Sequence, residues 1–367
     1  MNSKRIAQTS SLVLAVAMAA GCGSSSSTSP SSSASQAYNG PGSKWDVELF
    51  DDNTFTIERR ATPLTPVDLT VEGTYERFDS GFVGLTVSSA SGTDAPSQGD
   101  TAWALEVPGY AFLLKPTDGD QVIAMVTAGE CPTSDIDANW VMVKQRSDAD
   151  ATNSSMDYFG TFNYDISSNT PSLPSKYAIS TGFPAVVDGG DIGSGTCNDG
   201  LMLVGESPDV AAMYLTSTGG AIVQTNINNE ADSQFVFALG QKTISDIGNL
   251  QGSYAGMLFD DSMPDGQNIQ PVAMECDNTG TCTGTLVTDI TTGAQSTDSV
   301  TVTLNGAVDS MANGFVTGSI MDDGANTGNL ACMVDINANN SGKAIVNCVG
   351  QSPGDNTQMF NVMFVSI

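Results

Sequence analysis

The feature that most constrains the fold is a series of short apolar runs that extends from Trp45 to the end of the chain. Many of these runs alternate with polar residues, and Gly, Asp and Asn interrupt them about every eight to twelve residues. Apolar residues alternate with Thr in residues 300–304, whereas residues 234–239 are mostly apolar on both faces, as in a central strand. No convincing helical period follows the N-terminal segment. The pattern therefore predicts an all-β chain of tandem antiparallel modules, each a small barrel or sandwich.

A similar order of strands recurs in three segments of the chain, and polar stretches at residues 147–155 and 241–249 separate the segments. The alternative is that there is no true repeat, because any β protein shows similar strand-turn-strand patterns along its sequence. The matching strands are residues 111–114, 122–126 and 140–143 in the first segment, 212–215, 221–223 and 235–237 in the second, and 330–334, 344–346 and 359–364 in the third.

The N-terminal residues have the pattern of an export signal. Lys4 and Arg5 precede an apolar run that is too short to span a bilayer, and small residues follow it. Cys22 comes next, and the stretch Ala19-Ala20-Gly21-Cys22 resembles the lipobox of bacterial lipoproteins, with Ala19 where that family usually has Leu. The resemblance implies cleavage before Cys22 and attachment of lipid to its sulfur. An ordinary signal peptide with a chance cysteine is the alternative.

The residue after the cysteine and the serine-rich stretch indicate how the chain would be held. Gly23 stands where an inner-membrane retention signal usually has Asp, so the resemblance implies the outer membrane. A serine-rich segment without apolar periodicity predicts a disordered tether. The expected organisation is a signal peptide (residues 1–21), a lipidated cysteine and linker (22–43), and β modules at 44–146, 157–243 and 250–367.

Charge and composition exclude several classes of function. The chain has 41 acidic residues against 12 Lys and Arg, for a net charge of −29, and 40% of its residues are hydrophobic. This charge repels nucleic acid and suits cationic partners. It does not exclude a glycan or a protein as the ligand. The chain has no histidine, which excludes Ser-His-Asp and Cys-His catalysis and His-ligated zinc. No cofactor is expected.

The six cysteines other than Cys22 predict three disulfides in an exported chain. Six cysteines allow fifteen pairings, and the spacing favours one of them. A polar turn separates Cys276 from Cys282, and an expected hairpin tip lies midway between Cys332 and Cys348, which leaves Cys131 for Cys197. A four-cysteine zinc site from the two hairpins is the alternative.

Three further features could indicate a chemical function or could have only a structural role. Residues 335–339 begin like a calcium-binding EF-hand loop but lack its Gly and its final Glu, and Asp and Asn are also good turn residues. The tripeptide Asp79-Ser80-Gly81 matches an aspartic-protease motif only in part, and no second copy occurs. Trp45, Trp103 and Trp140 are expected in the core rather than on a sugar-binding surface.

The openings of the second and third segments, Phe159-Gly160-Thr161-Phe162 and Gly252-Ser253-Tyr254, resemble the start of lipocalin-type barrels, with Phe162 and Tyr254 in the place of that family's Trp. The resemblance carries no site over. The sequence favours an exported lipoprotein with a non-enzymatic binding or envelope-structural role. A carboxylate-dependent glycoside hydrolase and a calcium-dependent adhesin are the alternatives.

Overall fold

The structure is a computed structural model that describes most of the chain after residue 33. Among the described residues, no helix is long and apolar enough to cross a membrane. The described residues are 34–40, 44–61, 65–116, 122–127, 131–143, 158–179, 182–185, 193–198, 200–205, 210–216, 219–224, 235–242, 244–260, 268–305, 314–322, 326–352 and 359–367.

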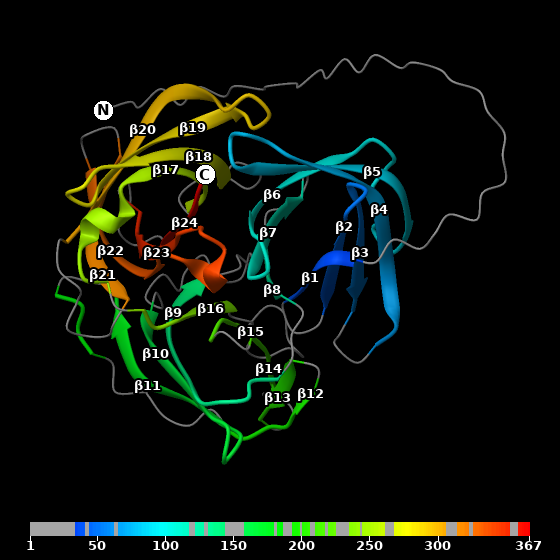
Figure 1. Ribbon diagram of the computed structural model, residues 1–367, viewed down its shortest axis with the longest axis horizontal. Coiled ribbons are helices and arrows are strands. Elements are labelled where there is room, and N and C mark those ends of the chain that lie inside the picture. Colours follow the sequence, from blue (N-terminus) through cyan, green and yellow to red (C-terminus); the bar gives the residue numbers. More distant parts are fainter. Residues whose placement is uncertain are drawn as a thin grey trace, which may run out of the picture. The chain divides into compact units, whose positions relative to one another are not determined.

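The first unit is a closed antiparallel barrel in which β1 pairs with both β2 and β8 (Figure 1). Its strands form because apolar residues alternate with polar ones. In β4, Leu69, Val71, Gly73 and Tyr75 are buried, and the residues that alternate with them are more exposed. The strands are β1 (Ala34–Gly40), β2 (Trp45–Phe50), β3 (Thr54–Arg60), β4 (Val67–Arg77), β5 (Phe82–Gly92), β6 (Thr101–Val107), β7 (Ala111–Pro116) and β8 (Ile123–Thr127).

The second unit is an eight-stranded antiparallel sheet in the order β11-β10-β9-β16-β15-β14-β13-β12. In the described part of the chain, no strand pairing joins β11 to β12, so the ladder is interrupted where the barrel of the first unit pairs β3 with β4. The strands are β9 (Ile136–Val143), β10 (Tyr158–Asp165), β11 (Thr170–Ala178), β12 (Cys197–Asn198), β13 (Leu201–Val204), β14 (Ala211–Leu215), β15 (Ala221–Gln224) and β16 (Phe235–Gly240).

The third unit is again a closed antiparallel barrel, in which β17 pairs with β24. Short 3-10 helices precede β17 and follow β22; these are η3 (Ile247–Leu250) and η4 (Ala338–Asn340). The strands are β17 (Gly252–Asp260), β18 (Ile269–Cys276), β19 (Thr281–Asp289), β20 (Ala294–Leu304), β21 (Phe315–Asp322), β22 (Asn326–Asp335), β23 (Ile345–Gln351) and β24 (Met359–Ser366).

This architecture confirms the predicted all-β class with tandem antiparallel units, and two of the units are barrels rather than sandwiches. Strand pairing places two strands differently from the expected boundaries. Strand β1 falls in the expected linker 22–43, and β9 falls in the expected module 44–146 although it pairs with β10 and β16. The physical reason is that a polar stretch such as residues 147–155 marks a loop, whether that loop lies between units or inside one.

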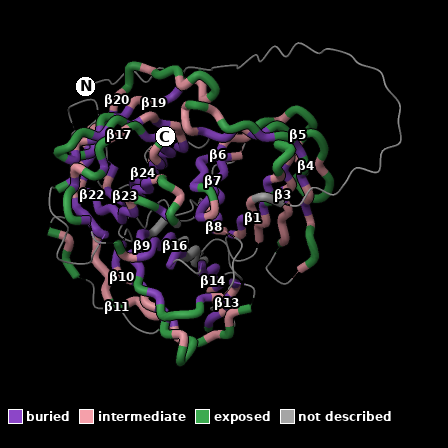
Figure 2. The backbone as a smooth tube through the Cα atoms, in the orientation of Figure 1, coloured by how far each residue is buried: buried purple, intermediate pink, exposed green. Residues whose placement is uncertain are grey.

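Each unit has its own cluster of buried apolar residues, and Figure 2 shows buried backbone segments in strands of all three units. An aromatic residue of the first strand lies inside each unit and is at most 2% exposed: Tyr38 in β1, Trp140 in β9 and Tyr254 in β17. In the part of the chain that the structure describes, apolar side chains therefore make up the interior of each unit.

A further apolar cluster, which we call the shared cluster, contains outward-facing residues of all three units. Its members include Phe82, Leu105 and Ala111 of the first unit, Val141, Phe159 and Phe237 of the second, and Met257, Phe315 and Met333 of the third. Because these strands are apolar on both faces, one face fills its own unit and the other packs against a neighbouring unit.

Direct contacts join each pair of units. The Ser80 hydroxyl of the first unit donates a hydrogen bond to the Ile290 carbonyl of the third. The rings of Phe159 and Phe315 stack with centroids 4.7 Å apart, which joins the second unit to the third. A Cβ on Gly220 of the second unit would lie 3.0 Å from the Tyr110 hydroxyl of the first. The three units therefore pack against one another and are not independent, separated domains.

Candidate functional site

The structure contains three disulfides, and they are the pairs that the cysteine spacing favours. Cys276–Cys282 and Cys332–Cys348 join neighbouring strands inside the third barrel. Cys131–Cys197 ties the segment before β9 to β12, so both of its cysteines belong to the second unit. The expected bounds put Cys131 in module 44–146 and Cys197 in module 157–243, whereas the structure places both in the second unit because β9 belongs to it. Cys22, the residue expected to carry the lipid, lies outside the described residues.

The tripeptide Asp79-Ser80-Gly81 forms the turn between β4 and β5, where it contacts the third unit. Gly81 has a φ of +87°, and a Cβ there would lie 2.8 Å from the Cβ of Ala255. The tripeptide that partly matches the protease motif therefore packs one unit against another.

The segment that begins like an EF-hand loop, residues 335–339, lies at the end of β22 and in the turn that leads to β23. The Asp335 carboxylate is 3% exposed and accepts a hydrogen bond from the Asn337 amide at 3.0 Å. The Asn337 side chain in turn accepts a hydrogen bond from the Gly342 amide at 2.9 Å. Among the described residues, no group of three or more acidic or cysteine side chains is placed to hold a metal ion. The loop is thus organised by its own hydrogen bonds and by Cys332–Cys348.

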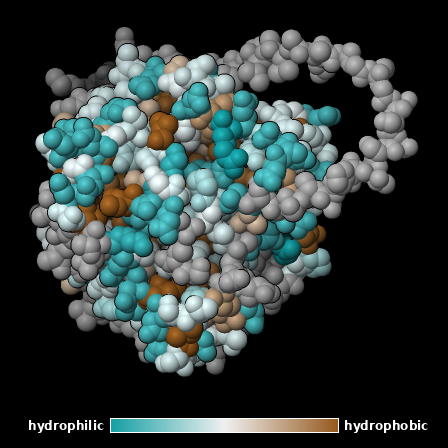
Figure 3. Space-filling model, in the orientation of Figure 1, coloured by the Kyte–Doolittle hydropathy of each residue, from teal (hydrophilic) through white to brown (hydrophobic). Residues whose placement is uncertain are grey.

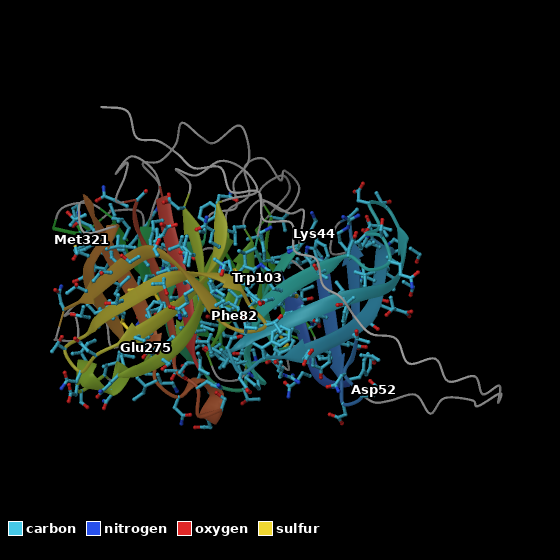
Figure 4. All side chains as sticks on the ribbon, turned by 90° about the horizontal axis from the view of Figure 1, so that it is seen from above. Lys44, Asp52, Phe82, Trp103, Glu275 and Met321 are labelled. Atoms are coloured by element: carbon cyan, nitrogen blue, oxygen red, sulfur yellow. A yellow bond between two sulfur atoms is a disulfide. The ribbon has the colours of Figure 1, made fainter. Side chains whose placement is uncertain are left out.

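The tryptophans occupy different environments. Trp140 is buried inside the second unit. Trp103 lies against the shared cluster and meets the Phe82 ring edge-on at 5.6 Å, and both side chains are labelled in Figure 4. Trp45 is half-buried beneath the Arg59 guanidinium at 5.8 Å. Only Trp140 is therefore a core residue as expected, whereas Trp45 and Trp103 are partly exposed and pack against buried clusters.

The most concentrated polar site among the described residues lies at one end of the first barrel, and we call it the Arg77–Glu106 cluster. Arg77 is the last residue of β4, and Glu106 lies in β6 with its side chain 3% exposed. The Arg77 Nε and Nη2 atoms donate to the two Glu106 carboxylate oxygens at 2.6 and 2.9 Å. This bidentate geometry is the strongest form of an arginine-carboxylate contact.

Two tyrosines complete the Arg77–Glu106 cluster. The Tyr38 hydroxyl donates to Glu106 at 2.8 Å. Arg77 also donates to the Tyr75 hydroxyl at 3.2 Å, and Tyr75 donates to the Phe50 carbonyl at 2.9 Å. Strands β1, β2, β4 and β6 are therefore linked across one end of the barrel by a continuous chain of hydrogen bonds.

Electrostatics keeps two members of the cluster, Tyr38 and Arg77, protonated. Burial, reinforced by the Glu106 carboxylate, raises the pKa of Tyr38 well above its ordinary value, so this phenol stays a donor. The hydrogen bond to Glu106 also raises the pKa of Arg77. Both Glu106 oxygens accept from Arg77, and one also accepts from Tyr38. The cluster is thus suited to closing the barrel end rather than to proton transfer or nucleophilic attack.

Sequence reasoning did not single out Arg77 or Glu106, although a local signal existed. In β6, Ala104 and Glu106 share one face, and Trp103, Leu105 and Val107 share the other. A carboxylate on the inward face of an apolar strand requires a partner inside the barrel. The alternation thus pointed to a buried partner for Glu106 but could not identify Arg77.

The buried Asp335 carboxyl leads to a prediction about pH. Burial raises its pKa above the ordinary 3.8, so the folded chain keeps a proton that the unfolded chain releases as pH rises. The stability from this group is present below the unfolded pKa and is lost as pH rises through the folded pKa. We therefore expect Asp335→Asn to become more stable relative to wild type as pH increases, measured by urea unfolding between about pH 3 and 7.

Asp277 provides a control of opposite sign. Hydrogen bonds from the Thr279 side chain and backbone lower its pKa. Its stability contribution is present above the unfolded pKa and is lost as pH falls through the folded pKa. Asp277→Asn should therefore lose stability relative to wild type as pH increases, and parallel pH profiles for the two variants would contradict at least one of the two assignments.

Comparisons with known proteins identify no family. No protein-family model matches the chain. No curated protein matches it either. A protein of unknown function from the DUF3598 family of Nostoc punctiforme PCC 73102 is 9% identical, in an alignment that covers 64% of this chain and 96% of that one, with a TM-score of 0.22.

Two other solved structures are similarly distant. A Bacteroides fragilis NCTC 9343 protein provisionally named as an outer membrane protein is 11% identical, with 64% of this chain and 96% of that one covered and a TM-score of 0.19. The WD40 domain of SCAP from fission yeast is 8% identical, with 91% and 96% covered and a TM-score of 0.14. Scores this low carry no inference about family or function.

Proposed function

We propose that this chain is an exported lipoprotein, held at the outer membrane through Cys22, with a non-enzymatic binding or envelope-structural role. The observation that carries the proposal is the N-terminal pattern of a cationic start, a short apolar run, small residues and Cys22. Three disulfides in the folded part are consistent with an oxidising compartment.

The way the described carboxylates are used supports a non-catalytic role. Only two of the described acidic side chains are buried, Glu106 and Asp335. Glu106 is held by Arg77 and Tyr38, and Asp335 accepts the Asn337 amide. A glycosidase needs two carboxyl groups facing one substrate bond. The buried carboxylates instead serve local structure in different units.

The outer surface is the part of the molecule that is available to a partner. Side chains fill the units, and only Val67 and Ile367 are exposed large hydrophobics in the described part of the chain. Figure 3 shows a face covered mainly by hydrophilic side chains with scattered apolar ones. With a net charge of −29, this surface suits a cationic, glycan or polar protein ligand better than an apolar one.

The position of β1 limits how far the folded part can stand from the proposed anchor. Only residues 23–33 separate Cys22 from Ala34, the first residue of β1. A segment of that length spans at most about 40 Å when fully extended. Two or more acyl chains on Cys22 hold a protein stably at a membrane. The first unit would therefore be held close to the membrane surface.

Metabolic labelling tests the anchor. Cells that express the full chain are given labelled palmitate and then fractionated, with Cys22→Ser as the test variant and Ser24→Ala as the matched control. We expect label and membrane association for the wild type and for Ser24→Ala, and neither for Cys22→Ser. If Cys22→Ser partitions with membranes as the wild type does and the wild type takes up no label, the anchor is wrong.

A second experiment tests the non-catalytic role independently of the anchor. The chain from residue 23 onward is incubated with a panel of polysaccharides, and the release of reducing ends is measured. We expect no turnover. Hydrolysis that a single Asp or Glu substitution abolishes would replace the binding role with the glycosidase alternative.

A further inference from the structure

The three disulfides differ in how far they are open to solvent. Cys276, Cys282, Cys332 and Cys348 are each at most 5% exposed inside the third barrel. Cys131 and Cys197 are both partly exposed. Thiol-disulfide exchange requires an attacking thiolate to reach one sulfur of the bond, so the rate depends on access. Access in the folded chain therefore favours the Cys131–Cys197 bond.

The strand environment strengthens this difference. Cys276 faces Cys282, and Cys332 faces Cys348, in the registers of long antiparallel ladders of a closed barrel. A reductant must open that barrel to reach them. Cys197, in contrast, lies in the two-residue strand β12 at one end of the second sheet (Figure 1). Strand β12 pairs with β13 through only two residue pairs.

The Cys131–Cys197 bond also lies where the second sheet has the fewest other links. In the described part of the chain, β11 and β12 are not paired, and the Gly195 amide donates to the Asn169 carbonyl at a long 3.3 Å. Cys197 packs against the interior of the second unit, and Cys131 precedes β9 by five residues. The covalent bond therefore holds β12 to the start of β9 across the interrupted part of the sheet.

We propose that Cys131–Cys197 is the thiol-disulfide exchange site of this chain: a dithiol reductant opens it in the folded protein while the two disulfides of the third barrel stay closed. One thiolate of the dithiol attacks a sulfur of the bond, forms a mixed disulfide and releases the other cysteine as a thiolate. The second thiol of the reductant then displaces the protein sulfur. Two electrons pass to the protein, which gains two thiols, and the reductant becomes a disulfide.

Opening the bond has a local structural consequence. Residues 193–205 contain β12 and β13 and lose their covalent tie to the segment before β9. The Asp135 carboxylate still accepts the Ile166 amide at 3.0 Å, so the start of β9 keeps a second attachment. Reduction should therefore loosen β12 and β13 while β9 and both barrels keep their structure.

Thiol trapping on the oxidised exported protein tests the proposal. The folded chain is treated with dithiothreitol for increasing times, quenched with an alkylating reagent and analysed by peptide mass. We expect label at Cys131 and Cys197 while the other four cysteines stay unlabelled, and full labelling only after denaturation. Equal or earlier labelling of Cys276, Cys282, Cys332 or Cys348 overturns the proposal, and so does resistance of all three bonds in the folded chain.

Hydrogen exchange on the same samples supplies the second measurement. The peptide that covers residues 193–205 should gain exchange after native reduction, and peptides of β4 and β22 should not. A Cys131→Ser, Cys197→Ser double variant should show the same local increase without reductant and should take up no label. If exchange after reduction rises equally in all three units, the bond supports the whole molecule and the proposed local site is wrong. Because the trapping uses the wild type, the result holds even if the double variant fails to fold.

Discussion

Phe159→Ala is expected to lower the free energy of unfolding by about 3–5 kcal/mol, the range for removing a buried phenylalanine side chain. Phe159 is 1% exposed, and its ring stacks on those of Phe315 at 4.7 Å and Tyr177 at 5.3 Å. It belongs to the shared cluster rather than to the interior of its own unit. The loss would therefore weaken the packing of the second unit on the third. Chemical denaturation of the purified protein measures this loss.

A double-mutant cycle separates this contact from a general loss of core. Combining Phe159→Ala with Phe315→Ala should give a coupling of about 0.5–1.5 kcal/mol, as expected for stacked aromatic rings. Phe162 is the matched control, because it is equally buried and lies in the same strand, but faces the interior of the second unit. Its coupling to Phe315 should stay below about 0.5 kcal/mol. Equal coupling in both cycles would show that the units do not meet at Phe159.

Glu106→Ala is expected to destabilise the first barrel by about 3 kcal/mol. Breaking a buried ion pair by removing one partner costs about 3–5 kcal/mol. The lower end applies here because the Arg77 side chain is 43% exposed and water can solvate it once Glu106 is gone. The variant also removes the nearer acceptor of the Tyr38 hydroxyl, at 2.8 Å, and leaves only the longer hydrogen bond to the Gln36 side-chain oxygen at 3.5 Å. Trp45 and Trp103 lie in the first unit, so their fluorescence reports its unfolding.

Glu76→Ala is the matched control for Glu106→Ala. Glu76 lies in β4 beside Arg77, and unlike Glu106 it is exposed. Its substitution should change stability by no more than about 0.5 kcal/mol. A loss for Glu106→Ala that is as small as the loss for Glu76→Ala would mean that the Arg77–Glu106 cluster does not hold the barrel end together.

Much of the fold followed from local patterns. The alternation of apolar and polar residues in β4 and β20 is visible in the sequence, and the burial of the same residues follows it. The pairs Cys276–Cys282 and Cys332–Cys348 could be predicted from the sequence for the same reason, since each joins residues on either side of a single turn. Local spacing was sufficient wherever the two partners are neighbours in the chain.

Unit membership did not follow from such patterns. Strand β9 is apolar and is followed by a polar stretch, which suits the end of one unit as well as the start of the next. Its pairing with β10 and β16 decides the matter. Strand β1 contains only one strongly apolar side chain, that of Tyr38, yet pairing with β2 and β8 places this ring inside the first barrel. Strand pairing is a long-range property that composition does not encode.

The amino-acid sequence by itself determined the β character of the chain, its acidic charge, the absence of histidine chemistry and the local disulfides. These are properties of single residues or of near neighbours along the chain. Only the tertiary structure decided that Arg77 pairs with Glu106 and that β1 and β9 are the first strands of their units. It also decided that outward-facing apolar residues of three units form the shared cluster. The reason is that the sequence pattern can show that a polar side chain will be buried and will require a partner. Which residue becomes that partner depends on which distant strands lie side by side in the fold.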